Sequence, residues 1–277
     1  MTDGPRTRRA AEAWRRSLAE WGIPDHILRA APESPYRFDV NLFATRADAA
    51  ADRVTFSNER ALEAVPEGGS VLDVGCGAGA ASLPLAVRAR ELIGVDASAD
   101  MLVAFRERAR ALGVRSGAVE GRWPDVGGEA PVADVVVCHH VFYNAPDLRA
   151  FVLALTDHSR GRVVVELTAT HPLSPMNDLW RRFHGVIRPE RPTTDEAVAV
   201  LEEAGLDLTR HDWTAPRPGG YADKQDLVAM IRRGLCLGPE RDAEIEAAVA
   251  ERIIERDGLF GLPDRPVSTL WWAGSAS

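Results

Sequence analysis

The feature that most constrains the fold is the segment VLDVGCGAGAASLPLA at residues 71–86. A β-rich run leads into Gly75, Gly77 and Gly79, and a helix is predicted directly behind them, to about residue 90. Glycines permit a tight turn and let a ligand approach the backbone, where the first turn of a helix offers free N–H groups. The next strand, in IGVDAS, ends at Asp96, whose carboxylate can accept hydrogen bonds from both hydroxyls of a ribose. The pattern predicts a site for a nucleoside cofactor.

The chain around this segment alternates between short β-rich runs and helical stretches. The predicted strands lie at 70–75, 91–96, 116–121, 133–139, 162–168, 206–215 and 266–274. Most are separated by helical patterns, which is typical of βαβ units and a mostly parallel sheet. Their apolar runs are nearly continuous, as expected for strands that helices cover on both faces. Two further helices are predicted at about 222–235 and 239–257, before the last strand.

Two classes of cofactor fit the glycine loop. Gly75-x-Gly77-x-x-Ala80 satisfies the dinucleotide pattern G-x-G-x-x-G/A, so an NAD or FAD oxidoreductase is one interpretation. That interpretation needs a second nucleotide-binding half, and the sequence shows none.

The rest of the segment resembles another family. The run D-V-G-C-G-A-G, with Asp73 two residues before the first glycine, is similar to the signature of class I S-adenosylmethionine-dependent methyltransferases. The strand ending in Asp96, with Met101 five residues later, fits the same family, and ADVVVCHHVFYNAPDL at 133–148 looks like its fourth-strand motif. The resemblance implies methyl transfer from S-adenosylmethionine. It also implies a Rossmann-like, doubly wound α/β fold, whose mostly parallel sheet has seven strands and a reversed last strand.

The expected domain organisation follows from this resemblance. Residues 1–64 are predicted to form an N-terminal helical lid, and residues 65–277 the cofactor-binding core, with a helical insertion at about 221–258.

The resemblance also assigns cofactor-binding roles. Asp73 and the backbone of Gly75 and Gly77, in the loop that Gly79 completes, would hold the methionine end of the cofactor. Asp96 would bind the ribose, while Ala97 and Met101 pack against the adenine. Where family members often have Gly-Asp-Ala, this chain has Gly121-Arg122-Trp123. What contacts the adenine amino group is therefore open, with Trp123 and Asp125 as candidates.

Candidates for catalysis and acceptor binding follow the fourth and fifth strands. A general base is required only when the acceptor keeps a proton on its reacting atom. His139 and His140 are the first candidates, and His139 is favoured; His139 also suits a contact with the cofactor. The long segment 169–193 begins where ligands bind in open α/β sheets, and it contributes His171 as a second candidate base.

Acceptor-binding candidates come from the same segment and from the N-terminal region. They are His184 and Arg188, together with Tyr36, which with Phe38 and Phe43 is predicted to form an aromatic lid.

Composition and the absence of certain motifs limit the classes of molecule that this protein is expected to bind. The formal net charge of −8 and the missing N-P-P-Y tetrad argue against a nucleic-acid substrate, which leaves a small molecule as the expected acceptor. The histidine and cysteine spacings predict no metal site, and no apolar run is long enough for a membrane span or secretory signal, so a cytoplasmic protein is expected. The methylated atom (O, N or C) and the oligomeric state remain open. A non-catalytic module that only binds the cofactor is an alternative function.

Overall fold

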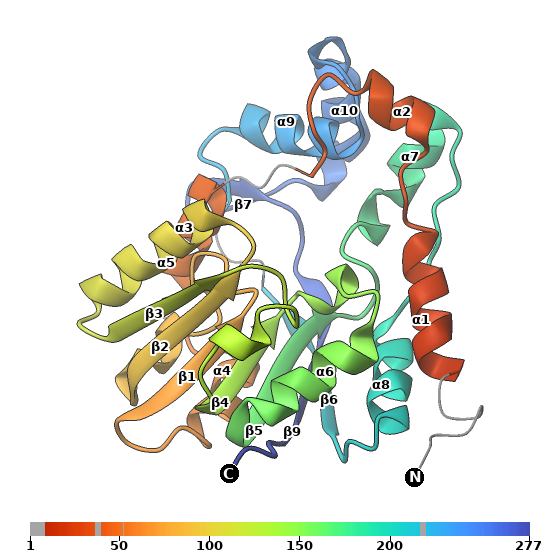
Figure 1. Cartoon of the computed structure of the whole chain (residues 1–277). Coiled ribbons are helices and arrows are strands. Elements are labelled where there is room, and N and C mark those ends of the chain that lie inside the picture. The colour runs from red at the N-terminus through yellow and green to blue at the C-terminus, as the bar shows by residue number, and fades with distance from the viewer. Residues whose placement is uncertain (1–8, 37–39, 52, 217–219) are drawn as a thin grey trace.

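The computed structural model describes residues 9–36, 40–51, 53–216 and 220–277 (Figure 1). Seven strands form one sheet in the order β3-β2-β1-β4-β5-β9-β6. They are β1 (Gly69–Val74), β2 (Ala89–Asp96), β3 (Arg115–Glu120), β4 (Ala133–His139), β5 (Ser159–Thr168), β6 (Thr209–Ala215) and β9 (Arg265–Ala273). Strand β9 runs antiparallel to both β5 and β6, and the other neighbours pair in parallel. The predicted mostly parallel sheet with a reversed last strand is confirmed.

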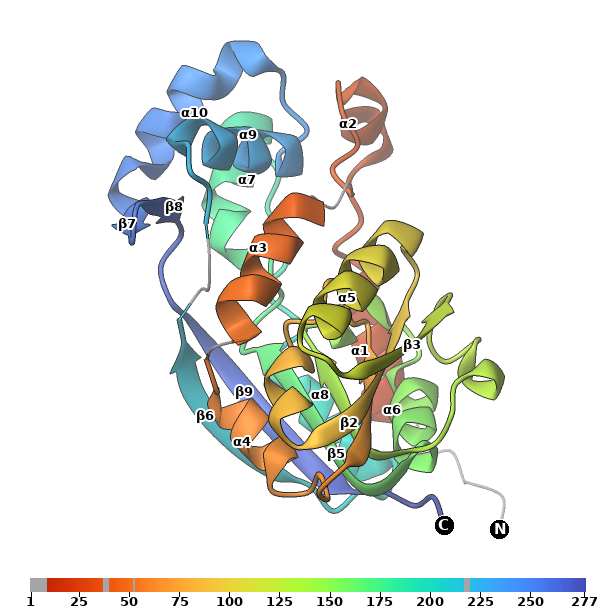
Figure 2. The ribbon, with the colours of Figure 1, turned by 90° about the vertical axis from the view of Figure 1, so that its left-hand side faces the viewer.

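α-Helices cover both faces of this sheet, and others lie beyond one end of its strands (Figures 1 and 2). They are α1 (Arg9–Ala19), α2 (Asp25–Ala30), α3 (Val40–Ala51), α4 (Phe56–Leu62), α5 (Ala99–Ala111), α6 (Leu148–Asp157), α7 (Asn177–His184), α8 (Thr194–Glu203), α9 (Lys224–Gly234) and α10 (Asp242–Val249). In the described ranges the chain also forms the 3-10 helices η1 (Leu83–Val87), η2 (Gly127–Glu129), η3 (Phe142–Asn144), η4 (Ser174–Met176), η5 (Pro239–Arg241) and η6 (Ala250–Arg252). A two-stranded ribbon, β7 (Ile254–Arg256) with β8 (Leu259–Gly261), precedes β9.

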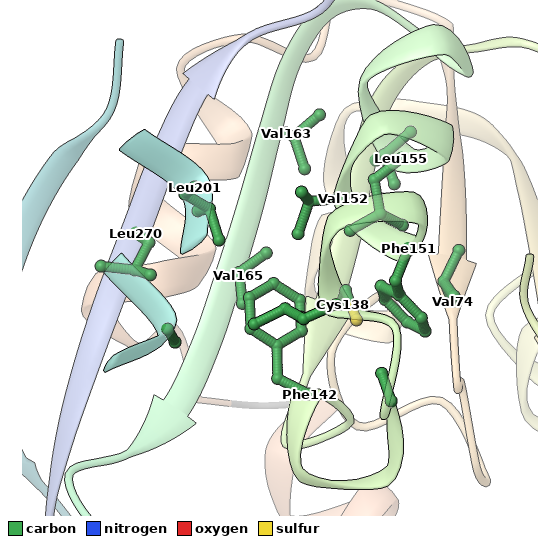
Figure 3. Close-up of a cluster of buried hydrophobic side chains, with 14 of the residues drawn as sticks. Val74, Cys138, Phe142, Phe151, Val152, Leu155, Val163, Val165, Leu201 and Leu270 are labelled. Carbon is green, nitrogen blue, oxygen red and sulfur yellow. The ribbon is translucent and has the colours of Figure 1, made fainter. Parts of the chain in front are cut away.

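One face of the sheet packs against α1, α6 and α8. Val152 of α6 lies toward Val163 and Val165 of β5, and Phe151 of the same helix lies toward Val74 of β1 (Figure 3). Burial of such side chains stabilises the fold by about 1.5–3 kcal/mol each. The opposite face packs against α3, α4, α5 and η1 around a second apolar cluster. Because both faces are covered, the strands carry almost unbroken apolar runs.

A third apolar cluster forms a cap beyond the carboxyl ends of β5 and β6 (Figures 1 and 2). The cap consists of α2, α7, α9, α10 and the β7–β8 ribbon, so three separate stretches of chain contribute to it. Its core includes Ile27 of α2, Trp180 of α7, Ile231 of α9 and Ile245 of α10, all buried. The chain leaves β5 and β6 toward the cap and returns from it into β9, so the cap lies at the edge of the sheet where the glycine loop also lies.

Two predicted helices differ from the structure. The chain behind the glycine loop forms turns and the short 3-10 helix η1, where an α-helix was predicted, and Pro84 in its first turn cannot donate a backbone hydrogen bond. The predicted helix at 239–257 is divided into η5, α10, η6 and strand β7. Within the described residues, no helix is long and apolar enough to cross a membrane.

Candidate active site

The glycine loop connects β1 to η1 at the carboxyl edge of the sheet. Gly75, Gly77 and Gly79 all have positive φ angles, of 73°, 50° and 101°. A Cβ atom on Gly75 would lie 2.3 Å from Val141 Cγ2, and one on Gly79 would lie 2.9 Å from Leu83 Cγ. At Gly77 the nearest atom would be Cδ1 of Phe43, at 3.4 Å. Packing therefore requires glycine at 75 and 79, whereas a Cβ atom at Gly77 would only come into van der Waals contact with the ring of Phe43.

Asp96, at the end of β2, is hydrogen-bonded to this loop. Its Oδ2 accepts from the backbone N–H of Gly77 at 2.9 Å, and its Oδ1 accepts from the N–H of Ser98 at 2.9 Å. An ionised carboxylate offers about four lone-pair positions, so two remain for a ligand. The loop and the carboxylate at the next strand end are thus joined by a hydrogen bond.

Asp73 lies inside β1, two residues before the loop, and is fully buried. Its Oδ2 accepts a hydrogen bond of 2.6 Å from the hydroxyl of Ser82, and its Oδ1 has no partner. Burial raises the pKa of Asp73 to about 7. A buried carboxylate oxygen without a donor is costly, and a ligand ammonium would satisfy it. Asp73, Asp96 and the glycine loop together fit a cationic nucleoside cofactor.

The residues predicted to contact the adenine differ in their exposure and in their contacts. Ala97 is exposed beyond the end of β2, whereas Met101 is buried in α5. The indole Nε1 of Trp123 donates to the carbonyl of Phe151 at 3.2 Å, and its ring packs edge-on against His158. This donor therefore anchors the chain after β3 to α6.

The two histidines at the end of β4 differ in their partners. His139 is in register with Glu166 of β5, its Nε2 is buried without a partner, and burial lowers its pKa. His140 follows the strand with a φ angle of 62°, and its Nε2 lies 3.0 Å from Oε1 of Glu166. Only the second histidine has a carboxylate partner.

The sequence analysis did not name Glu166 as a candidate site residue. The available signal was a single acidic residue within the apolar run RVVVELT. It is 6% exposed, and its Oε2 accepts a hydrogen bond of 2.6 Å from Ser57 of α4. Burial opposes ionisation, but the hydrogen bond from His140, the nearby imidazoles and the Ser57 hydroxyl together lower the pKa of Glu166 to about 2. A charged carboxylate is thus held inside the protein, next to the ends of β4 and β5.

His171 lies beside α1. Its ring stacks on Trp21 at a centroid distance of 3.7 Å, and its Nδ1 accepts from the N–H of Leu173. Burial, together with the charge of Arg188, lowers the pKa of His171 to about 4. The ring lines a cavity of about 250 Å³. The other residues that line this cavity are Arg15, Leu18, Ala19, Trp21, Tyr143, Asn144 and Pro146.

Arg188 and His184 make structural contacts in the cap. Arg188 is 6% exposed, donates to the carbonyls of Trp21 and Gly22, and lies over the rings of Trp21 and Trp180. His184 contacts the carbonyl of Leu235 through Nε2 at 2.6 Å. These contacts join the N-terminal segment, α7 and α9.

The predicted aromatic lid is described only in part. Tyr36 is 61% exposed, Phe43 of α3 lies beside Gly77, and Phe38 is outside the described residues. Across the described ranges, no three His, Cys, Asp or Glu side chains gather in a way that would hold a metal ion.

Comparison with known proteins identifies this arrangement. Residues 71–160, which run from β1 into β5 and include the glycine loop, Asp96 and both histidines, match a family model described as a methyltransferase domain. The matched stretch, which is less than half of the chain, is similar to methyltransferase domains. This similarity favours S-adenosylmethionine over NAD or FAD as the cofactor. The sheet order agrees, since the antiparallel β9 between β5 and β6 is absent from the dinucleotide-binding order.

Solved structures show the same fold. The YcgJ protein of Bacillus subtilis matches with a TM-score of 0.52 and 20% identity, covering 80% of this chain and 98% of its own. A cyclopropane-fatty-acyl-phospholipid synthase-like protein of Lactobacillus casei matches with a TM-score of 0.54 and 16% identity, covering 90% and 98%. At these identities the likeness concerns the fold. A search of curated protein sequences found no match.

Proposed function

We propose that this methyltransferase transfers the methyl group of S-adenosylmethionine to a small-molecule acceptor. The observation that carries the proposal is the pair of carboxylates at the glycine loop. Asp73 has one buried oxygen without a donor, and Asp96 has free lone pairs beside Gly77. In this proposal Asp73 receives the ammonium group of the cofactor, Asp96 binds the ribose hydroxyls, and the backbone of Gly75 and Gly77 lies against the methionine portion. S-adenosylmethionine supplies a methyl group on a sulfonium, an excellent leaving group.

Further contacts complete the proposed cofactor site. Ala97 and Met101 would pack against the adenine, as the resemblance implies. Because the Trp123 indole already donates to Phe151, we assign recognition of the adenine amino group to the backbone near Trp123 or to Asp125. We propose that His139, whose Nε2 is buried and has no partner, lies next to the reacting group.

The small size of the acceptor is inferred from the cap. The cap lies over the carboxyl edge of the sheet, where ligands of open α/β sheets bind (Figure 1). A covered edge excludes water, which protects the methyl donor from side reactions. It also leaves little space for a folded macromolecule, and the net charge of −8 gives no advantage to nucleic acid.

The acceptor is proposed to lie between the ends of β4 and β5 and the cap. Among the earlier candidates, His171 lines a cavity beside Tyr143 and keeps Nε2 available, whereas Arg188 and His184 are engaged in holding the cap together. Tyr36 is exposed and remains a candidate contact.

Calorimetry tests the proposal directly. The protein is titrated with S-adenosylmethionine, S-adenosylhomocysteine, NAD and FAD, and only the first two should bind. Transfer of a labelled methyl group to a panel of small hydroxyl, amine and carboxylic acid compounds then tests for turnover. Binding of NAD or FAD alone would refute the assignment. Tight binding of S-adenosylmethionine with no transfer to any acceptor in the panel would favour the non-catalytic module.

A further inference from the structure

A cavity of about 250 Å³ lies where α1 meets the segments that follow β4 and β5. Its wall includes Trp21, just after α1, Tyr143 of η3 and His171, which follows β5. Leu18 of α1 and Pro146, ahead of α6, add apolar surface. In another protein, a cavity of roughly 150 Å³ already accommodates benzene. This cavity therefore has room for one aromatic ring that carries a polar substituent.

The segment around η3 borders both this cavity and the glycine loop. Val141, which directly precedes η3, packs so closely against the loop that a Cβ atom on Gly75 would lie 2.3 Å from its Cγ2. Tyr143 and Asn144 of η3 line the cavity. The cavity thus lies beyond the carboxyl ends of β4 and β5, which is where ligands of open α/β sheets bind.

The imidazole of His171 offers this cavity a hydrogen-bond donor. Its Nδ1 accepts the backbone N–H of Leu173 at 3.3 Å, so the lone pair of Nδ1 is already used. Burial, together with the charge of Arg188, lowers the pKa of His171 to about 4, so the ring is neutral at pH 7. A neutral imidazole whose Nδ1 accepts carries its proton on Nε2. His171, which the sequence suggested as a second candidate base, is therefore a donor for recognition and has no lone pair left to take a proton.

The charges near the cavity are mostly positive. Arg15 of α1 lines the cavity, is exposed, and forms no ion pair with any described residue. Arg188, which lies over the ring of Trp21, is buried and also has no carboxylate partner within the described ranges. Of the described residues that line the cavity, none is acidic. Asp147, next to Pro146, is not part of the wall, and its side chain caps α6. The cavity therefore favours an anionic ligand.

We propose that this cavity binds the acceptor of the methyl transfer and that the acceptor is a small aromatic carboxylic acid. The proposal rests on the proposed function and deepens it by naming the class of substrate. The carboxylate accepts from Nε2 of His171 and pairs with Arg15, whose planar guanidinium matches two carboxylate oxygens. The ring lies against Leu18 and Pro146, and the reacting atom, at the other end of the acceptor, faces the glycine loop.

The first test measures binding without the cofactor. The full chain is titrated with 4-hydroxybenzoate and, separately, with 4-hydroxybenzamide, which has a similar shape and no charge. In nitrogen–proton spectra, the acid should shift the signals of the Trp21 indole and of the Asn144 side-chain amide. The amide should bind about 10-fold more weakly, because it forms no charge-assisted pair with a guanidinium. Equal affinity for the two probes, or no shift of the cavity signals, would overturn the proposal.

Variants identify the groups that bind the carboxylate. Arg15→Gln should weaken binding of 4-hydroxybenzoate about 10-fold and leave binding of 4-hydroxybenzamide nearly unchanged. His171→Phe keeps an aromatic ring on Trp21 and removes the N–H donor, so it should also weaken binding of the acid. Arg16→Gln is the matched control, because Arg16 is the neighbouring exposed arginine of α1 and does not line the cavity. A loss in Arg16→Gln equal to that in Arg15→Gln would contradict a site at the cavity.

The last test asks whether the cavity is the acceptor site. With S-adenosylmethionine that carries a ¹³C-labelled methyl group, the complex with 4-hydroxybenzoate should show a nuclear Overhauser effect between that methyl group and the ring protons, or labelled methyl in a product. Binding of the acid with neither result would overturn the acceptor assignment. Calorimetry with S-adenosylmethionine reports separately on the proposed function: Arg15→Gln should bind it as the wild type does. A wild type that binds 4-hydroxybenzoate and no S-adenosylmethionine would contradict the proposed function, and with it the role of the cavity as acceptor site.

Discussion

The hydroxyl of Ser82 donates a hydrogen bond of 2.6 Å to Asp73 across the glycine loop, and it satisfies only one oxygen of that buried carboxylate. In the proposed function, this pair prepares the loop for a cation, because one oxygen is held by the protein and the other would accept from the ligand. The same arrangement makes the ionised form of Asp73 unfavourable until the ligand is bound.

The first prediction concerns stability and pH. Burial raises the pKa of Asp73 from 3.8 to about 7, so between these values the folded protein keeps a proton that the unfolded chain releases. The contribution of Asp73 to the free energy of unfolding should therefore fall as pH rises from about 4 to about 7, by about 1.4 kcal/mol per pH unit or roughly 4 kcal/mol in all. His140 and His171, whose pKa values are lowered to about 4, contribute in the opposite direction, so the Asp73 contribution is measured as the difference between the wild type and Asp73→Asn. In urea unfolding Asp73→Asn should make the slope against pH more positive, whereas Asp134→Asn should keep the wild-type slope. An unchanged slope in Asp73→Asn would contradict the assignment.

A second prediction uses the same carboxylate in binding. Below pH 7 a cationic ligand must displace the proton from Asp73, so binding of S-adenosylmethionine should release about one proton at pH 6. Calorimetry in two buffers of different ionisation enthalpy measures this number. The release should be absent at pH 8.5 and absent from Asp73→Asn wherever binding is still detectable. Equal proton release in that variant would show that another group is responsible.

The third prediction concerns Asp96. Asp96→Ala should weaken S-adenosylmethionine binding by about 2 kcal/mol or more, because charge-assisted hydrogen bonds to the ribose are lost and the Gly77 N–H loses its acceptor. Asp134→Ala is the matched control, since Asp134 also accepts two local hydrogen bonds, from the N–H and hydroxyl of Ser70. Unchanged affinity in Asp96→Ala would remove Asp96 from the site.

The fourth prediction distinguishes loss of ligand space at Gly77 from the effect of backbone strain alone. Gly77→Val should leave a folded protein that no longer binds the cofactor, because the branched side chain fills the space beside the loop. Gly113 also has a positive φ angle and has no atom within 4 Å of an added Cβ. Gly113→Val therefore carries similar strain without touching the site, and it should bind normally. Circular dichroism checks the fold of both variants, and normal binding by folded Gly77→Val would reduce Gly77 to a turn residue.

The fifth prediction concerns Arg188. Arg188→Ala removes donors from the carbonyls of Trp21 and Gly22 and a cation from between two indole rings. We expect the free energy of unfolding to fall by about 1–3 kcal/mol, with the affinity for S-adenosylmethionine unchanged. The opposite result, unchanged stability with loss of methyl transfer, would return Arg188 to the acceptor site where the sequence placed it.

The sheet and the glycine loop could be predicted because their signals are local. Alternating apolar runs and the distance from Gly77 to Asp96 are read from short stretches of sequence. The contacts of Trp123 and Arg188 could not be predicted, because their partners, Phe151 and Trp21, are distant in sequence.

The contact of His140 with Glu166 could not be predicted from the sequence either, although its cause is a local turn. Strand alternation favoured His139, but a left-handed turn gave its neighbour the carboxylate. A turn of this kind has no signature in the residue types alone.

The cap has a kinetic consequence. Its apolar cluster joins α2, α7 and the 224–261 region, which are distant from one another in sequence. The packing contacts of the cap therefore form only after long loops have closed. The sheet, which does not depend on the cap for its two main clusters, can form first. Native proteins also open locally, in cooperative units that often coincide with separately packed regions of this kind. Entry and exit of ligands at the carboxyl edge can then proceed by brief detachment of the cap, while the strands beneath keep their hydrogen bonds.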